Sequence, residues 1–250
     1  MKTIAIIPAR YASTRFPGKP LAVLCGKTVI QRVYSQVEKQ LNDVCVATDD
    51  ERIFNHVKSW GGNVIMTRSD HKSGTDRIEE AVEKLEEAGQ VYDVIVNVQG
   101  DEPFIHPSQI SALCDCFKDD RTQIATLGIR FGKNMENVSN PNSPKIVLDN
   151  KGFAMYFSRS VIPYCRNVDY SMWAESFDFV KHIGMYAYRR DILREITALP
   201  QSILEKSESL EQLRWLQNGY RIKVGETDLE TIGIDTPDDL KKAEKFLMES

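Results

Sequence analysis

The segment from Pro8 to Pro20 has the composition of a phosphate-binding loop. It carries Arg10, Arg15 and Lys19 with a serine and a threonine hydroxyl, and it contains no acid. Guanidinium groups bind phosphate oxygens through paired hydrogen bonds, and a lysine can bring a movable charge to a reacting phosphoryl group. The segment matches neither the GxxxxGK[ST] loop nor the GxGxxG fingerprint. A solvated basic loop would have the same composition, so its place directly after a predicted strand is what favours a site.

Two acids, Asp101 and Asp235, also follow predicted strands. Carboxylates repel nearby phosphates unless a hard cation bridges the two, and Mg²⁺ commonly takes one or two carboxylates plus phosphate oxygens. The pair therefore predicts a magnesium site beside the phosphates. Each acid also has an ordinary structural explanation, because Asp101 could cap a loop and Asp235 precedes Thr236 and Pro237, a common helix start.

A third loop, from His71 to Arg77, offers backbone amides near Gly74 and small hydroxyls at positions where a base or ribose could approach closely. The same residues would also form an ordinary helix start before Asp76. Both interpretations remain open from this loop alone.

Alternating strands and helices position these loops. The apolar runs predict strands, and the helical spacing of apolar residues predicts helices between them, which is typical of a parallel α/β sheet with ligands at the carboxyl ends of its strands. A hairpin with a glycine turn interrupts the alternation, so we predict one domain over residues 1–250 with an inserted region at about 130–180. The segment from 163 to 180 gives no assignment. The expected strands are 3–7, 44–47, 64–66, 94–98, 124–129, 145–148, 153–157, 182–188, 222–224 and 231–234, and the expected helices lie within 28–41, 50–58, 76–88, 108–117, 191–198, 208–218 and from 236 onward.

Composition narrows the class of protein. The 250 residues are 42% hydrophobic and 27% charged, which is typical of soluble globular proteins, and no apolar run is long enough for a membrane span or a secretory signal. Five scattered cysteines argue against a disulfide framework and favour a reducing, cytoplasmic compartment. The net charge of −4 excludes a generally basic nucleic-acid binder, although residues 1–37 hold six basic residues and no acid.

Eight collinear blocks closely resemble the 3-deoxy-manno-octulosonate (Kdo) cytidylyltransferases, also called CMP-Kdo synthetases, over nearly the whole chain. The blocks are IPARYASTRFPGKPL at 7–21, VATDD at 46–50, HKSGTDR at 71–77, NVQGDEP at 97–103, YFSRSVIP at 156–163, KHIGMYAYR at 181–189, ESLEQLRWL at 208–216 and IDTPDDL at 234–240.

The resemblance implies an enzyme that transfers CMP from CTP to Kdo with Mg²⁺, releasing pyrophosphate and activating the sugar for lipopolysaccharide assembly in the bacterial cytoplasm. It implies a Rossmann-like nucleotidyltransferase fold, with a mixed, mainly parallel sheet flanked by helices. It also implies a homodimer in which the inserted region contributes to the sugar site and the dimer contact, with no nucleic-acid or membrane partner. A cytidylyltransferase for a related acid such as 8-amino-Kdo, and a non-catalytic nucleotide-binding protein of the same fold, are the alternatives.

The resemblance also assigns residues. The nucleotide-binding positions are Ala9, Arg10, Ser13, Arg15, Lys19, Ser73, Gly74 and Gln99. The catalytic positions are Lys19, Arg10, Arg15, Asp101 and Asp235, of which Asp101 and Asp235 hold the metal. The sugar-binding positions are Arg77, Arg159, His182, Tyr186, Glu211 and Gln212. In an apolar strand His182 would also suit a core histidine, Glu211 and Gln212 would suit a helix surface, and the alignment of Arg166 stays open.

Overall fold

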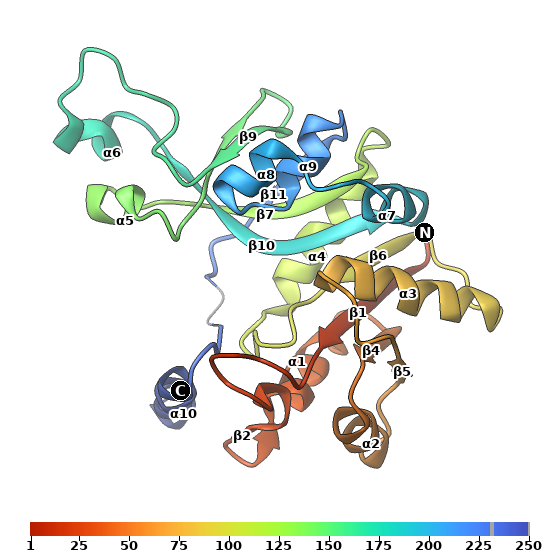
Figure 1. Cartoon of the computed structure of the whole chain (residues 1–250). Helices are drawn as coiled ribbons and strands as arrows, with labels where there is room; N and C mark the ends of the chain where they lie inside the picture. Colours follow the sequence, from red (N-terminus) through yellow and green to blue (C-terminus); the bar gives the residue numbers. More distant parts are fainter. Residues whose placement is uncertain (231–232, 250) are drawn as a thin grey trace. The chain divides into compact units, whose positions relative to one another are not determined.

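The computed structural model describes residues 1–230 and 233–249, which form two compact units (Figure 1). The first unit comprises Met1–Ser111, Arg189–Thr197 and the described part of 231–250, and the second comprises Ala112–Tyr188 and Ala198–Glu230. The single domain with an insert at about 130–180 stays a prediction.

Four parallel strands form the sheet of the first unit. Their order is β6–β1–β4–β5, with Ala5 opposite Val44 on one side of the central strand and Thr3 opposite Val94 on the other. The strands are apolar and mostly buried because helices cover both faces. Because the four strands are parallel, their carboxyl ends meet at one edge of the sheet, and the three loops with candidate functional residues emerge there. The strands are β1 (Thr3–Ala9), β4 (Val44–Thr48), β5 (Val64–Met66) and β6 (Val94–Asn97).

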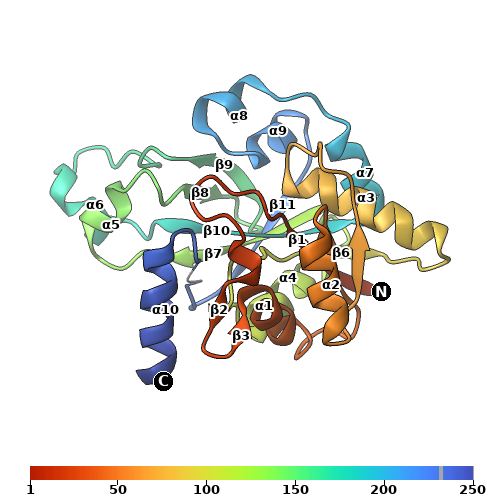
Figure 2. The ribbon, with the colours of Figure 1, turned by 60° about the horizontal axis from the view of Figure 1, so that its bottom comes forward.

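Side-chain caps begin the main helices of this unit. Thr28 and Asp50 accept backbone hydrogen bonds at the starts of α1 and α2, and Ser73 and Asp76 form a reciprocal capping box at the start of α3. In Figure 2, α1 lies on one face of the sheet and α3 on the opposite face, and both contact β1 and β4. The unit also contains a short hairpin, β2 and β3, and the start of α4. The bounds are η1 (Lys19–Leu21), β2 (Val23–Leu24), β3 (Lys27–Thr28), α1 (Val29–Val37), α2 (Glu51–Ser59), α3 (Gly74–Glu87), α4 (Pro107–Asp115), α7 (Arg190–Thr197) and α10 (Pro237–Glu249).

The segment before α10 differs from the prediction. Thr231 and Ile232, the first half of the expected strand 231–234, lie outside the described residues, and Gly233 and Ile234 are not in a strand. Ile234 is instead held by its backbone amide, which donates to the carbonyl of Asp101 at 2.9 Å, and by its buried side chain, which packs with Leu24, Val29 and Ala243. The helix start at Thr236 is confirmed, because its hydroxyl accepts from the amide of Asp239.

The second unit is built on three strands, of which β10 runs antiparallel to β7 and β11 runs parallel to it. The predicted hairpin is confirmed as β8 and β9, and β8 also pairs with β10. The segment 163–180, which the sequence left unassigned, contains two short helical elements and the first residue of β10. The bounds are η2 (Cys116–Lys118), β7 (Ile124–Arg130), α5 (Met135–Ser139), β8 (Lys145–Leu148), β9 (Ala154–Ser158), η3 (Tyr170–Met172), α6 (Trp173–Ser176), β10 (Val180–Arg189), α8 (Ile203–Glu208), α9 (Gln212–Gln217) and β11 (Ile222–Glu226).

The predicted helix 208–218 is wrong in its first part. Glu208 ends α8, Ser209 adopts a left-handed conformation with φ of 51°, and α9 begins only at Gln212. A left-handed serine cannot lie inside an α-helix, so the chain turns there.

All five cysteines are free thiols, as the sequence predicted. Burial raises the pKa of Cys114 and of Cys116 to about 11. Within the described residues, no helix is long and apolar enough to span a membrane.

Candidate active site

A cavity of about 280 Å³ lies at the carboxyl edge of the first unit's sheet. It is lined by the loop after β1, the loop before α3, the loop after β6, and Asp235. All eight predicted nucleotide-binding residues and both predicted metal-binding acids line it, as does Arg77. The lining also includes residues to which the sequence assigned no role: Pro8, Pro20, His71, Lys72 and Gly100.

Lys19 lies at the centre of an ion-pair cluster in this cavity. Its Nζ donates to Asp101 Oδ2 at 2.6 Å and to Asp235 Oδ1 at 3.1 Å, and Arg15 reaches Asp235 Oδ2 at 3.2 Å. The Lys19 side chain is only 12% exposed, whereas Asp101 and Asp235 are 34% and 48% exposed. The cluster brings two cations of the basic loop onto two acids that are 82 and 216 residues away from Lys19 in the chain.

Two local features place these groups. Gly18 adopts a left-handed φ of 73° immediately before η1, which turns the chain so that Lys19 begins this short helix. Gly100 lies so close to β1 that a Cβ there would be 2.8 Å from the carbonyl oxygen of Pro8. Glycine at this position therefore lets the loop carrying Asp101 approach the end of β1.

The donor set of this cluster fits a hard divalent cation. Asp101 and Asp235 hold the same ammonium nitrogen, so their oxygens already converge on one position that a cation occupies. In the described part of the chain, no group of three or more His, Cys, Asp and Glu side chains could hold a metal. A pair of carboxylates completed by phosphate and water is the arrangement that suits Mg²⁺.

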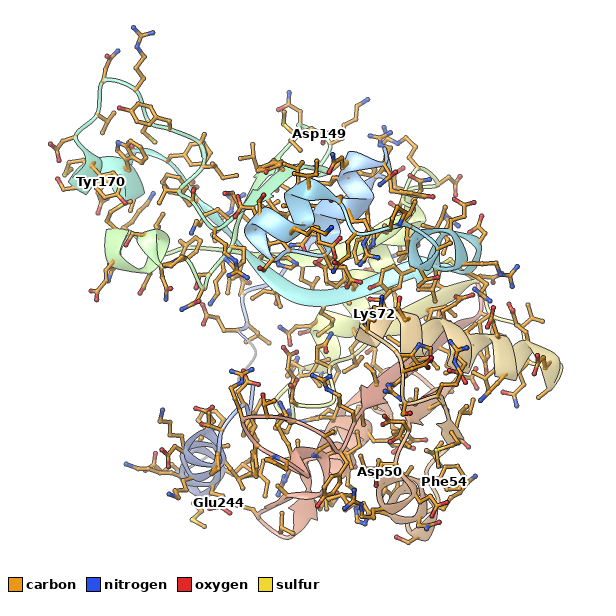
Figure 3. The ribbon with its side chains drawn as sticks, viewed as in Figure 1. Asp50, Phe54, Lys72, Asp149, Tyr170 and Glu244 are labelled. Carbon is orange, nitrogen blue, oxygen red and sulfur yellow. The ribbon has the colours of Figure 1, made fainter. Side chains whose placement is uncertain are left out.

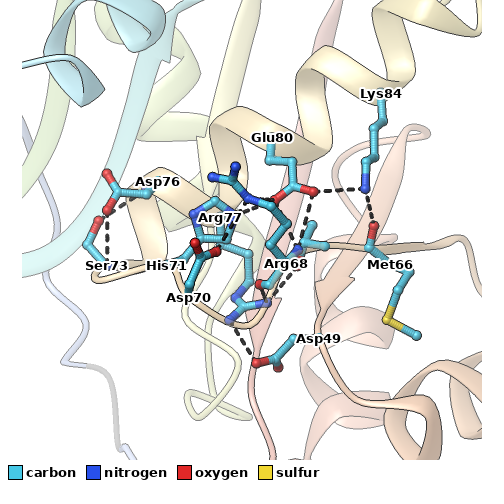
Figure 4. A network of polar contacts seen from close by, with 11 residues as sticks. Asp49, Met66, Arg68, Asp70, His71, Ser73, Asp76, Arg77, Glu80 and Lys84 are labelled. Carbon is cyan, nitrogen blue, oxygen red and sulfur yellow. Dashed lines mark hydrogen bonds and ion pairs between the residues drawn. The ribbon is translucent and has the colours of Figure 1, made fainter.

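Arg77 lines the cavity but is held from behind by a polar network (Figure 4). It donates to the Thr67 hydroxyl at 2.6 Å and forms an ion pair with Asp49 at 3.3 Å, and its side chain is 5% exposed. In the same network His71 contacts the carboxylate of Glu80, which also accepts from Lys84 and from the amide of Arg68.

The pKa of Glu80 reflects this network. Burial alone would raise it, but the hydrogen bonds from Lys84, His71 and Arg68 outweigh burial and lower the pKa to about 2. Glu80 is therefore ionised at neutral pH and fixes the loop that carries His71 against α3.

The remaining predicted sugar-binding residues lie in the second unit. Arg159 follows β9, and its guanidinium donates to the carbonyl oxygens of Glu208 at 2.6 Å and Pro141 at 2.9 Å. Glu211 precedes α9 and accepts from Arg214 at 3.0 Å. Arg166 is exposed, in the segment between β9 and η3.

His182 and Tyr186 lie side by side on β10 of this unit, and Gln212 is buried at the start of α9. The His182 ring lies 5.5 Å from the Tyr186 ring between centroids and contacts the Thr126 hydroxyl at 3.1 Å. Burial lowers the pKa of His182 to about 3, so the ring is neutral at physiological pH. Gln212 is 3% exposed, and its Nε2 has no hydrogen-bond partner within the described residues. A buried amide in this state has an unmet need for an acceptor.

The comparisons with known proteins place this geometry in a family. A family model described as Cytidylyltransferase matches residues 4–224. The 3-deoxy-manno-octulosonate cytidylyltransferase of Parabacteroides distasonis is 62% identical over 99% of this chain and 98% of its own length. The enzyme of the same name from Bacteroides thetaiotaomicron is also 62% identical, with the same two shares covered. This chain belongs to the 3-deoxy-manno-octulosonate cytidylyltransferase family.

Solved structures agree with this membership. The structure of CMP:2-keto-3-deoxy-manno-octonic acid synthetase complexed with CTP matches with a TM-score of 0.90 and 41% identity, over 100% of this chain and 99% of that one. A cytidylyltransferase from Leptospira borgpetersenii matches with a TM-score of 0.61 at 16% identity over 100% of this chain and 88% of that one, a likeness of fold alone. The prediction of a nucleotidyltransferase fold, with a mixed, mainly parallel sheet flanked by helices, is confirmed.

Proposed function

We propose that this chain transfers CMP from CTP to Kdo, giving CMP-Kdo and pyrophosphate. The observation that carries the proposal is the single cavity in which Arg10, Arg15 and Lys19 meet Asp101 and Asp235. A passive nucleotide-binding protein needs cations for phosphates but has little use for two carboxylates among them. The relatives at 62% identity carry the name of this activity.

The basic loop would bind and orient the triphosphate. In nucleotidyl transfer the sugar hydroxyl attacks the α-phosphorus in line, and the protein mainly positions the reactants and stabilises the spreading negative charge. The exposed Arg10 and Arg15 side chains suit paired hydrogen bonds to phosphate oxygens. Lys19 would leave its two carboxylates for the reacting phosphate, because its flexible stem allows that movement.

Asp101 and Asp235 would hold Mg²⁺. When bound there, the ion would neutralise phosphate charge and lower the pKa of the attacking hydroxyl, so no separate general base is required. Ala9, Ser13, Ser73, Gly74 and Gln99 would face the nucleotide, with backbone and small polar groups that permit close approach.

Among the predicted sugar-binding residues, those of the second unit that would hold the acceptor are Arg159, His182, Tyr186, Glu211 and Gln212, whereas Arg77 lines the cavity of the first unit. The neutral His182 and the unpartnered Gln212 Nε2 offer hydrogen bonds to sugar hydroxyls rather than charge. 8-Amino-Kdo carries an ammonium group where Kdo has a hydroxyl. A few contacts to that group would decide which of the two acids the enzyme accepts.

The protein would act in the cytoplasm as a homodimer, in lipopolysaccharide synthesis. Within the described residues, the segment 164–177 of the second unit exposes several large apolar side chains, which a second copy would cover. They are Tyr164, Tyr170, Met172 and Phe177, of which Tyr170 is labelled in Figure 3.

Pyrophosphate release tests the reaction and the acceptor together. The protein is incubated with CTP and Mg²⁺ in parallel with Kdo, 8-amino-Kdo or N-acetylneuraminic acid. We expect release with Kdo alone. Release with another acid would keep the reaction and correct the substrate, and no release despite measurable CTP binding would overturn the proposal.

A further inference from the structure

The side chain of Tyr11 stacks against a guanidinium outside the cavity. The Arg52 Cζ lies 3.3 Å from the centroid of the Tyr11 ring. Arg52 is fixed in place, because its Nε and one terminal nitrogen donate to the two oxygens of Asp50 at 3.0 and 2.6 Å. Asp50 also caps α2 by accepting from the amide of Arg52. Helix α2, which Asp50 caps and on which Phe54 is labelled in Figure 3, therefore presents the Arg52 cation to the basic loop.

The same tyrosine contacts the other end of that loop. A Cβ added at Gly18 would lie 3.0 Å from Cζ and Oη of Tyr11, so the phenol fills the space that a side chain would need. The amide of Gly18 donates to the carbonyl of Tyr11 at 2.9 Å. The ring thus joins the residue after Arg10 to the residue before Lys19.

Neither Tyr11 nor Arg52 lines the cavity. The basic loop carries three cations that repel one another. It has no regular secondary structure between Arg10 and the start of η1 at Lys19. A loop that is held in place before its ligand arrives avoids the entropic cost of ordering when the ligand binds.

We propose that Tyr11 and Arg52 are positioning residues, whose stack holds the basic loop in the conformation that binds the triphosphate. The inference rests on the proposed function, in which this loop binds CTP. Because the Arg52 side chain is 60% exposed, the stack contributes little to global stability and acts on the loop.

Four variants test the proposal: Tyr11→Leu, Tyr11→Phe, Arg52→Gln and the double variant Tyr11→Leu/Arg52→Gln. Arg121→Gln in the second unit is the matched control. Arg121 donates two hydrogen bonds to the carboxylate of Asp119, as Arg52 does to Asp50, and its Cζ lies 5.4 Å from the centroid of the Phe153 ring. Calorimetry measures the Kd of CTP, steady-state kinetics measures KM and kcat, and hydrogen exchange measures protection of the amides in 11–19.

We expect Tyr11→Leu and Arg52→Gln each to raise the Kd and KM of CTP by 5- to 20-fold and to speed exchange in the loop, with a Tm near the wild-type value. Tyr11→Phe and Arg121→Gln should stay within twofold, and the double variant should be no worse than the more affected single variant, since both remove one interaction. Unchanged CTP affinity in Tyr11→Leu, equal losses in Tyr11→Phe, or additive losses in the double variant would overturn the proposal. Calorimetry needs no turnover, so a wild-type protein that binds CTP without releasing pyrophosphate would refute the proposed function and leave this test intact.

Discussion

Replacing Lys19 by methionine should have opposite effects on metal binding and on turnover. The substitution keeps an unbranched stem of similar length and removes the ammonium, which lies 2.6 Å from Asp101 and 3.1 Å from Asp235. If Asp101 and Asp235 bind a divalent cation as proposed, that ammonium would compete with it for the same carboxylates in the ligand-free protein. We expect Lys19→Met to bind Mn²⁺ more tightly than the wild type in the absence of nucleotide.

The size of this effect follows from the exposure of the two acids. An ion pair at about 4 Å is worth about 1 kcal/mol in water and about 4 kcal/mol near a protein surface. Because Asp101 and Asp235 are 34% and 48% exposed, the water-like figure applies, and two pairs give about 2 kcal/mol. The dissociation constant for Mn²⁺ should therefore fall roughly 10- to 100-fold, since about 1.4 kcal/mol corresponds to a factor of ten.

Electron paramagnetic resonance of free Mn²⁺ measures this binding at constant ionic strength. Lys72→Met is the matched control, because Lys72 lines the same cavity and its loss changes the net charge by the same amount. We expect turnover of Lys19→Met to fall about 10²- to 10³-fold, as when one charge-stabilising donor is removed, while the Kd of CTP changes less. An Mn²⁺ affinity equal to that of the wild type, or an equal gain in Lys72→Met, would refute the reasoning.

Three further predictions concern single side chains. Asp235→Asn should leave CTP bound but reduce turnover about 10²-fold or more across a magnesium titration, and wild-type activity at any magnesium concentration would remove the assignment. Glu80→Gln should lower stability by about 1–2 kcal/mol at pH 7, because the pKa of Glu80 is lowered to about 2 and an ionised carboxylate in this network is stabilising. That contribution is present above the ordinary pKa of 4.5 and is lost as pH falls towards 2, so the difference in Tm from the wild type should narrow below pH 4.5, and a constant difference would contradict it. Because burial lowers the pKa of His182 to about 3, its ring stays neutral above about pH 4, and the NMR signal that His182→Gln removes should not shift between pH 5 and 8.

The sequence predicted the elements whose signals are local. Thr28, Asp50 and Thr236 have the residue types of helix caps, and the apolar runs of β1 and β4 predicted strands. The break at Ser209 was not, because a left-handed serine has no spacing signal and the helical pattern runs on through it. Local patterns therefore predicted where helices start better than where they are interrupted.

The cavity could be predicted because the edge of a parallel sheet brings distant loops together, which places residues near 10, 74 and 100 side by side once the strand order is known. What the sequence could not supply is the partner of each side chain. Nothing in the residues around Lys145 indicates that it is buried and donates to the carbonyl oxygens of Asn140 and Arg159, or that Arg159 itself donates to backbone carbonyls. Such contacts depend on tertiary packing, to which a single sequence gives no access.

The charge pattern of the basic loop explains why its acids come from elsewhere in the chain. Acids within the loop would bind Arg10, Arg15 and Lys19 permanently, because a short loop keeps its own charges in contact whether or not a ligand is present. Asp101 comes instead from the loop after β6 and Asp235 from the segment before α10, so under the proposed function their contacts with Lys19 and Arg15 would be exchanged for a cation and a phosphate without refolding the loop. Since both acids and both cations would gain a new partner of opposite charge in that exchange, the proposed loaded cavity would stay close to the electrical balance of the empty one.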